Sequence, residues 1–93
     1  MLLTLIVPYQ LYLLECLDGT FYAGIALDVE ERFVKHLLGW GARYTRSHPP
    51  RRVVACRAYA SRGEALRAEY ALKQLARKDK LGFFLASETY QGY

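Results

Sequence analysis

Five residues of the types that carry out acid–base and phosphate chemistry are distributed along the chain. They are Tyr12, Tyr22, Arg32, His36 and Glu69. Cleavage of a phosphodiester by water requires a base for the water, a cation on the phosphate and stabilisation of the charge that develops on the leaving oxygen. A phenol or imidazole, a guanidinium and a metal-binding carboxylate can supply these three functions if the fold brings them together.

Glu69 is the candidate ligand for a divalent metal. In a helix predicted from residue 61 to about residue 80, it falls inside or at the margin of the apolar stripe. A carboxylate there lowers stability unless a cation meets it. Magnesium binds proteins through one or two carboxylates and keeps several waters, so a lone glutamate suffices for Mg²⁺ or Mn²⁺. The alternative is an ordinary surface glutamate that pairs with Lys73, one helical turn further on.

The other four residues also have two explanations each. Arg32 and His36 lie four residues apart on one face of a predicted helix. The arginine would hold a phosphate as a planar fork, or it forms an ordinary salt bridge. The histidine would act as a base or hydrogen-bond donor, or it is structural. Tyr12 and Tyr22 fall in predicted strands, where packing alone is a sufficient reason for tyrosine.

Turn, capping and periodicity signals predict the elements that must position these residues. Asp18-Gly19 is a hairpin turn, and capping boxes begin at Asp28 and Ser61. Alternation places Tyr22 and Gly24 on one face of their strand. The predicted elements are strands at 9–17, 20–26 and 52–60, helices at 28–38 and 61–80, and a loop at 41–50. This ββαβα order predicts an α+β fold with a small three-stranded, mostly antiparallel sheet and packed helices.

The length of 93 residues allows one small domain. We expect it to span residues 1–93, with its core at about 9–81 and terminal extensions at 1–8 and 87–93. The apolar content of 53% excludes a disordered chain. The apolar residues 1–7 lack the features of an export signal and are too few to span a membrane, so we expect a short tail or an extra strand in a cytoplasmic protein. Cys16 and Cys56 are expected to be buried free thiols in a reducing compartment.

The net charge of +4 is concentrated in one segment. Residues 41–52 contain four arginines and no acid: Arg43, Arg46, Arg51 and Arg52. Clustered arginines repel one another unless they face an anion, and nucleic acid is the commonest such partner. A solvated loop is the alternative.

Five motifs, in order along the chain, resemble those of the GIY-YIG nuclease superfamily. They are Leu11-Tyr12-Leu13, Tyr22-Ala23-Gly24, residues 28–36, residues 41–46 followed by Pro50, and residues 65–73. The fourth is similar to a loop of the short stand-alone bacterial members, which also resemble the nuclease domain of the eukaryotic structure-specific junction endonuclease. The first motif departs from the family pattern at Gln10-Leu11, where the family has Gly and Ile, and the second departs at Ala23.

This resemblance implies a GIY-YIG domain and a role for each of the five residues. Tyr12 and Tyr22 correspond to the water-activating and phosphate-orienting pair. Arg32 corresponds to the phosphate-binding arginine, His36 to an accessory acid or base, and Glu69 to the metal ligand. The residues expected to bind nucleic acid are Arg43, Tyr44, Thr45, Arg46, Arg51 and Arg52.

The leading hypothesis is therefore a metal-dependent nuclease that hydrolyses DNA phosphodiesters at branched structures or ends. The alternative is a non-catalytic nucleic-acid-binding module of the same fold that acts with a partner protein. DNA is favoured over RNA, and no membrane association is expected. Either a protein partner supplies specificity or the domain has only weak specificity of its own, and a homodimer is the alternative association.

Overall fold

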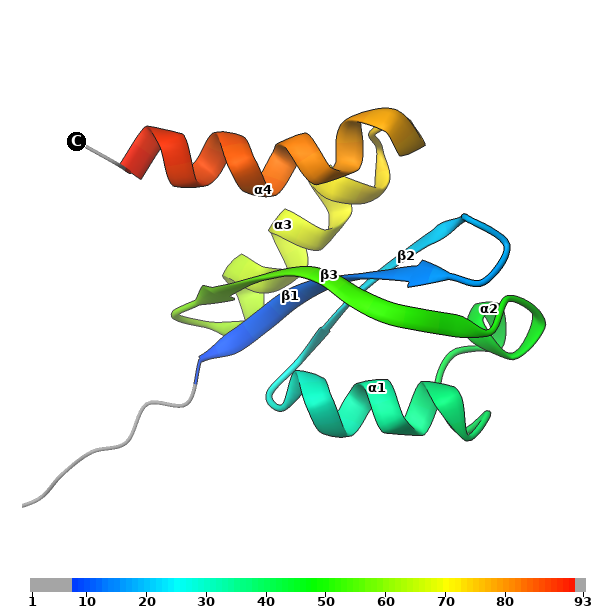
Figure 1. Cartoon of the computed structure of the whole chain (residues 1–93). Coiled ribbons are helices and arrows are strands. Elements are labelled where there is room, and N and C mark those ends of the chain that lie inside the picture. Colours follow the sequence, from blue (N-terminus) through cyan, green and yellow to red (C-terminus); the bar gives the residue numbers. More distant parts are fainter. Residues whose placement is uncertain (1–7, 92–93) are drawn as a thin grey trace, which may run out of the picture.

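The computed structural model describes the backbone of residues 8–91 and the side chains of residues 8–85. Its elements follow the order ββααβαα (Figure 1). They are β1 (Tyr9–Cys16), β2 (Phe21–Ala26), α1 (Val29–Leu37), α2 (Arg43–Ser47), β3 (Pro50–Tyr59), α3 (Arg62–Lys73) and α4 (Arg77–Gln91). The strands form one antiparallel sheet in the order β2-β1-β3. The predicted α+β fold is confirmed.

The hairpin between β1 and β2 forms where the sequence predicts it. Gly19 adopts a positive φ of 84°, and the Asp18 carboxylate accepts hydrogen bonds from the Thr20 N–H and hydroxyl. The resulting register pairs Tyr12 with Gly24. Since residues directly opposite in a sheet project from the same face, the Tyr12 ring lies over a residue that has no side chain.

Both faces of the sheet are covered (Figure 1). On one face, Leu11 and Leu13 of the central strand form a core with Leu72 and Phe84 from α3 and α4. On the other, Tyr12, Leu14 and Ala26 form a core that is completed by α1 and by β3. The alternation of side chains in β1 therefore places Leu11 and Leu13 in one core and Tyr12 and Leu14 in the other, as expected for a central strand buried on both sides.

The sequence predicts one long helix at residues 61–80. This prediction is wrong in one respect, because the segment forms parts of two helices. α3 ends at Lys73 with Gln74 as its C-cap, and α4 begins at Arg77. The break turns the chain so that Phe84 returns to the core beside Leu72. The Lys80 ammonium donates a 3.0 Å hydrogen bond to the Leu72 carbonyl, which also accepts from the Leu75 N–H at 3.1 Å, so that α4 is tied to the last turn of α3.

Two irregular segments of the prediction are also helical. The expected loop at 41–50 contains the short helix α2, and the expected tail from residue 87 continues α4 as far as Gln91. Residues 1–7 and 92–93 lie outside the described part, and with them the predicted tail or extra strand at 1–7. Within residues 8–91, no helix is long and apolar enough to cross a membrane.

The prediction of two buried free thiols is half right. Neither cysteine is in a disulfide, but Cys16 is buried whereas Cys56 is exposed. Cys56 lies in β3, an edge strand of the sheet, where neighbouring elements cover the surface less completely than they cover β1.

Candidate active site

A hydrogen-bonded chain of three buried side chains links β1, α1 and α2. The Tyr12 hydroxyl lies 2.9 Å from His36 Nε2, and His36 Nδ1 lies 2.7 Å from Thr45 Oγ1. Each of the three residues is at most 2% exposed. Polar groups buried this deeply are stable only when they are paired, so the chain fixes the orientation of all three side chains.

Local sequence signals place the members of this chain. Asp28 is the N-cap of α1, and its side chain accepts from the Glu31 N–H at 3.1 Å. His36 then falls in its last turn, on the side that faces the sheet. Helix α2 presents Thr45, its one buried residue, toward the same point.

The available partners determine where the protons lie in the chain. The Thr45 hydroxyl has one proton, and its oxygen is 2.9 Å from the Ala42 carbonyl, which can only accept. Thr45 therefore accepts from His36 Nδ1–H, and the Nε2 lone pair accepts from the Tyr12 O–H. The Ala42 N–H also points at Nδ1 and would require the opposite tautomer, but at 3.4 Å it is the longest of these contacts. We assign the proton by the shorter bonds.

Two glycines make room for the chain. A Cβ on Gly24 would lie 2.5 Å from the Tyr12 hydroxyl oxygen and 2.8 Å from Cζ of the ring. A Cβ on Gly41 would overlap the imidazole of His36. Neither glycine has a positive φ, so each is required for space and not for backbone conformation.

Burial and charge keep both Tyr12 and His36 neutral. Burial raises the pKa of Tyr12 well above its ordinary value of 10.0; the neighbouring Tyr22 and Glu69 add to the rise, and the charge and hydrogen bond of Arg32 oppose it. Burial also lowers the pKa of His36 below 6.5, and Arg32 contributes to this second shift. At neutral pH, Tyr12 therefore holds its proton beside an imidazole that can accept it.

A pocket of about 370 Å³ opens beside this chain. Its walls include Tyr22, Arg32, Lys35 and His36 and contain no carboxylate. The Tyr22 ring packs edge-on against His36, with 5.3 Å between ring centroids. Arg32, which also acts on Tyr12, thus connects the buried hydroxyl to the pocket. The combination of two cations, a phenol and an imidazole suits an anionic substrate.

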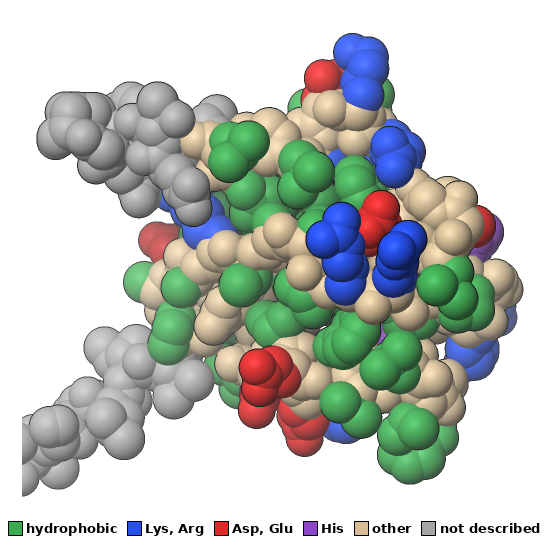
Figure 2. Space-filling model, in the orientation of Figure 1, with side chains coloured by type: hydrophobic (Ala, Val, Ile, Leu, Met, Phe, Trp, Pro, Cys, Tyr) green, Lys and Arg blue, Asp and Glu red, His purple; other side chains and the backbone are tan. Residues whose placement is uncertain are grey.

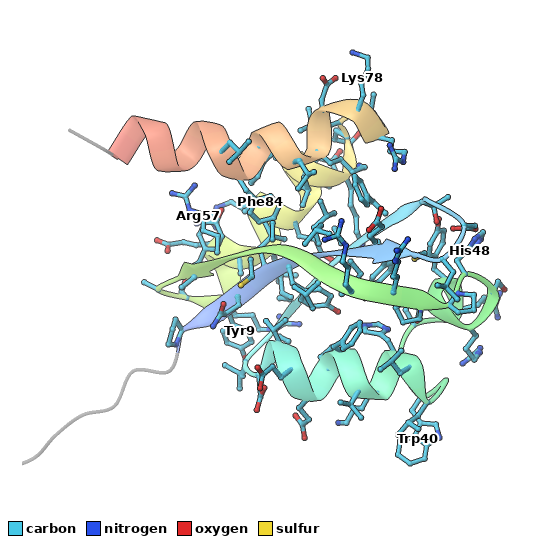
Figure 3. All side chains as sticks on the ribbon, viewed as in Figure 1. Tyr9, Trp40, His48, Arg57, Lys78 and Phe84 are labelled. Carbon is cyan, nitrogen blue, oxygen red and sulfur yellow. The ribbon has the colours of Figure 1, made fainter. Side chains whose placement is uncertain are left out.

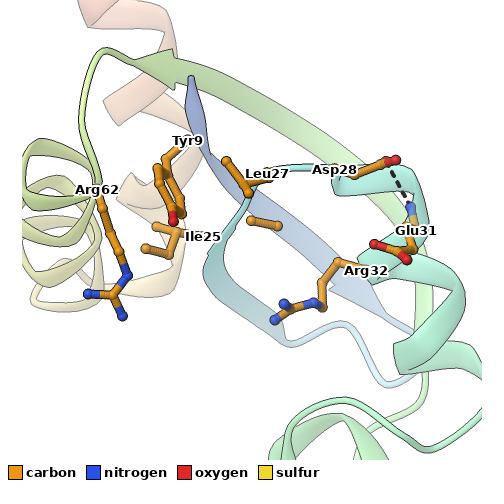
Figure 4. Close-up of a pocket in the computed structure, with 8 residues that line it drawn as sticks. Tyr9, Ile25, Leu27, Asp28, Glu31, Arg32 and Arg62 are labelled. Carbon is orange, nitrogen blue, oxygen red and sulfur yellow. Dashed lines mark hydrogen bonds between the residues drawn. The ribbon is translucent and has the colours of Figure 1, made fainter. Parts of the chain in front are cut away.

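Arg32 also borders a second pocket, of about 460 Å³. Figure 4 shows the Arg32 guanidinium reaching toward it from α1, with Arg62 and the Tyr9 ring on the opposite wall. Tyr22 and His36 line the smaller pocket but not this one, whereas the buried Tyr12 lines neither. We therefore place the chemistry in the smaller pocket.

Glu69 approaches the same site from the other layer of the molecule. Its Oε2 lies 3.0 Å from Lys73 Nζ, which in turn lies 5.7 Å from the centroid of the Tyr22 ring. Its charge also contributes to the raised pKa of Tyr12. α3 packs on the face of the sheet opposite α1. The charge of the Glu69 carboxylate therefore affects Tyr12 from the other side of β2, the edge strand. The ordinary pairing with Lys73 therefore exists, and it lies beside the phenols.

The residues present suit a hard divalent cation. Within the described part of the chain, no group of three or more His, Cys, Asp or Glu side chains could hold a metal. A divalent ion at this site would have Glu69 as its carboxylate and would complete its shell with waters and phosphate oxygens, as Mg²⁺ commonly does. Lys73 pairs with Oε2 of that carboxylate, and no described ion pair engages Oε1.

The basic segment divides between surface and interior. Arg43 and Arg46 on α2 are exposed, whereas Tyr44 is stacked between Tyr22 and His48, with centroid distances of 5.7 and 4.1 Å. Thr45 is 1% exposed, so the expectation that it contacts nucleic acid does not fit its position. Its hydroxyl orients His36 instead. The sequence signal for this role was its place in the same motif as Gly41, which also contacts His36.

The remaining two arginines lie in β3. Arg51 and Arg52 are exposed, and Arg52 Nε donates to the Glu15 carboxylate at 2.7 Å. This hydrogen bond, together with the charges of Arg52, Arg51 and Arg77, lowers the pKa of Glu15. Figure 2 shows basic side chains with an acidic one between them on the face that β3 presents. These arginines thus have an acidic neighbour that the local sequence does not reveal.

Comparison with known proteins identifies the family and the fold. Residues 8–81 match the family model of the GIY-YIG catalytic domain. The chain is 52% identical to a UPF0213 protein of Xanthomonas campestris over 85% of this chain and 78% of the relative. Two solution structures are similar. The UPF0213 protein BH0048 of Bacillus halodurans has 46% identity and a TM-score of 0.51, over 85% of this chain and 82% of that one. Protein EF2693 of E. faecalis has 33% identity and a TM-score of 0.63, over 88% of both chains. The motifs, the sheet and these matches together show that the chain belongs to the GIY-YIG family, which has a nuclease-type fold.

Proposed function

We propose that this protein is a metal-dependent nuclease that hydrolyses DNA phosphodiester bonds, with the scissile phosphate in the pocket beside Tyr22, Arg32 and His36. The observation that carries the proposal is the buried chain from Tyr12 through His36 to Thr45. It pairs a phenol with an oriented, neutral imidazole next to a cationic pocket. Apolar side chains could fill the same core, so three buried polar groups next to a cationic pocket favour a chemical role.

Tyr12 is the residue that activates water in this proposal. Its raised pKa means that it is not a base by itself at neutral pH, but its proton lies on a 2.9 Å hydrogen bond to His36 Nε2. As the phenol passes this proton to the imidazole, its oxygen takes a proton from the attacking water. The Thr45 oxygen accepts from His36 Nδ1–H and so stabilises the imidazolium that forms.

Tyr22 and Arg32 orient the phosphate. Among the described residues, no hydrogen bond is made by the Tyr22 hydroxyl, and its ring lines the pocket. It is thus available to donate to a phosphate oxygen. The Arg32 guanidinium carries a permanent charge and can bind two such oxygens at once, which stabilises the charge on the phosphoryl group during attack.

Glu69 would hold the divalent ion, Mg²⁺ or Mn²⁺, on the leaving-group side. When bound, the ion would polarise the phosphate and neutralise charge on the departing oxygen. The exposed Arg43 and Arg46 of α2 would bind flanking phosphates, in accord with the nucleic-acid binding that the domain family implies. The preference for branched structures or ends is part of the proposal.

Cleavage of defined substrates by matched variants tests the proposal. Flapped, branched, duplex and single-stranded DNA would be incubated with Mg²⁺, Mn²⁺ or EDTA. Tyr12→Phe and Glu69→Gln are expected to lower the cleavage rate at least about 100-fold, as expected for loss of an acid–base group or of a metal ligand. Tyr70→Phe and Glu64→Gln, at exposed positions on α3, are the matched controls and should cut at the wild-type rate.

A DNA-binding measurement beside the cleavage assay distinguishes a nuclease from a non-catalytic binding module of the same fold. If the wild type binds DNA but cuts none of the substrates with either metal, the protein is a binding module. If Tyr12→Phe folds normally and cuts as fast as the wild type, the proposed proton path is wrong. Chemical denaturation of each variant shows whether lost activity reflects lost structure.

A further inference from the structure

Trp40 is the most exposed of the large apolar side chains that the structure describes, at 73%. Figure 3 shows it projecting away from the end of α1, where no other element covers it. Yet it also forms part of the wall of the pocket that contains Tyr22, Arg32 and His36. The Trp40 ring leaves a large apolar area in contact with water. Because it lies at a cationic pocket, it suits a ligand with an aromatic face.

The turn that holds Trp40 is well defined. After α1, the Trp40 N–H donates to the Lys35 carbonyl at 2.8 Å and the Gly39 N–H donates to the His36 carbonyl at 3.1 Å. Gly39 has a φ of 81°. Together these features form a Schellman motif, in which the residue after the glycine commonly packs on an apolar residue of the last turn. The corresponding residue here is Lys35, and the indole remains largely in solvent. Helix capping therefore accounts for the backbone position of Trp40 but not for the exposure of its side chain.

We propose that Trp40 is a stacking platform for an unpaired base of the nucleic acid, next to the phosphate held in the pocket. The proposal deepens the proposed function and rests on it. A phosphate bound by Arg32 and Lys35 would place an adjoining nucleotide within reach of the indole, since all three side chains line one pocket. Aromatic side chains beside a cationic groove bind single strands in this way, because every base has a face that can stack.

The charge around Trp40 favours nucleic acid over a second copy of the chain. The pocket has Arg32 and Lys35 in its wall and no carboxylate, and Arg43 is exposed just beyond it. A symmetric dimer through this surface would bring the same cations from two chains together, each chain having a net charge of +4. A nucleotide supplies both the aromatic face and the negative charge. The unpaired base also gives the proposed preference for branches and ends a physical cause.

Trp40 is the one tryptophan of the chain, so its fluorescence reports stacking directly. In EDTA, single-stranded oligothymidylate and oligouridylate of equal length would be titrated against a blunt duplex. Both single strands are expected to quench the fluorescence strongly, whereas the duplex quenches it weakly. The two single-stranded titrations separate DNA from RNA as the source of the base.

Substitutions then measure the contribution of the ring. Trp40→Ala is expected to weaken single-strand binding about 5- to 100-fold by anisotropy, and Trp40→Phe should retain most of the affinity. Leu38→Ala is the matched control, because Leu38 is 55% exposed in the same turn but has no ring and does not line the pocket. It should bind as the wild type does.

The outcomes distinguish this inference from the proposed function. Unchanged binding by Trp40→Ala, while the wild type cleaves DNA, overturns the role of Trp40 and leaves the nuclease proposal standing. Quenching by single strands without cleavage of any substrate supports base stacking and overturns the nuclease proposal. The fluorescence could instead be quenched by raising the protein concentration without nucleic acid, and Trp40→Ala could differ from the wild type in oligomeric state. These two results together would show that a second copy covers the indole and would overturn the inference.

Discussion

Replacing Gly24 with alanine adds one methyl group at a point of the sheet where the Tyr12 side chain leaves no room for it. The new Cβ would lie 2.5 Å from the Tyr12 hydroxyl oxygen and 2.8 Å from ring Cζ, whereas ordinary contacts of a Cβ begin near 3.4 Å. Tyr12 is 1% exposed and its hydroxyl is bonded to His36, so the ring can move only by breaking that bond. The substitution therefore forces overpacking onto the hydrogen-bonded chain.

The expected size follows from these contacts. Overpacking of a core costs about 1–3 kcal/mol, and loss of the Tyr12–His36 bond costs about a further 1 kcal/mol. Alanine recovers about 0.5–1 kcal/mol of backbone entropy relative to glycine in a strand. Gly24→Ala should thus lower the free energy of unfolding by about 1–3 kcal/mol. Gly82→Ala is the control, because nothing lies within 4 Å of a Cβ at that helical position. It should stabilise the protein by about 0.5–1 kcal/mol.

Urea denaturation of the two variants and the wild type measures both changes, and the melting temperature should follow them by about 4–8 °C per kcal/mol. Gly24→Ala should also cut DNA more slowly, since Tyr12 is displaced from His36. A Gly24→Ala protein that is as stable and as active as the wild type would refute the argument, because it would show that Tyr12 has room that the geometry denies it.

Three further predictions concern the same site. Thr45→Val should lower the free energy of unfolding by about 1–3 kcal/mol, because the buried Nδ1 of His36 loses its partner, and should slow cleavage; denaturation and rate measurements check this. The pKa of His36 is lowered in the folded protein, so below pH 6.5 the unfolded chain binds a proton more readily and the free energy of unfolding should fall, a dependence that His36→Gln should reduce in urea titrations across pH. Lys73→Met frees the Glu69 carboxylate from its ion pair, so half-maximal cleavage should need less Mn²⁺ than in the wild type; an unchanged metal titration would show that Lys73 does not compete with the ion.

Much of the fold could be predicted because its signals are local. The Asp18-Gly19 turn and the alternation of β2 set the register of the hairpin, which in turn sets Gly24 against Tyr12. A capping box at Asp28 placed the start of α1 correctly and hence the face that bears His36. The proximity of the tyrosines, Arg32 and His36 follows from these local choices.

What the sequence did not reveal depends on contacts between distant segments. Neither glycine nor proline marks the break between α3 and α4, which serves the packing of Phe84 and the hydrogen bond from Lys80. The inward position of Thr45 depends on the docking of a five-residue helix, too short to have a readable apolar period. The pairing of Arg52 with Glu15 joins neighbouring strands and could not be read before the strand order was known.

The position of α3 on the far side of the sheet has a consequence for synthesis of the protein. Both phenols and the imidazole come from segments that precede β3, but the carboxylate at residue 69 comes from the helix that follows that last strand. A chain that stops after β3 would therefore contain the phosphate-binding side chains without the proposed metal ligand, and without Leu72 and Phe84, which cover Leu11 and Leu13. The proposed metal ligand and one of the two core layers of the sheet thus depend on the same C-terminal helices.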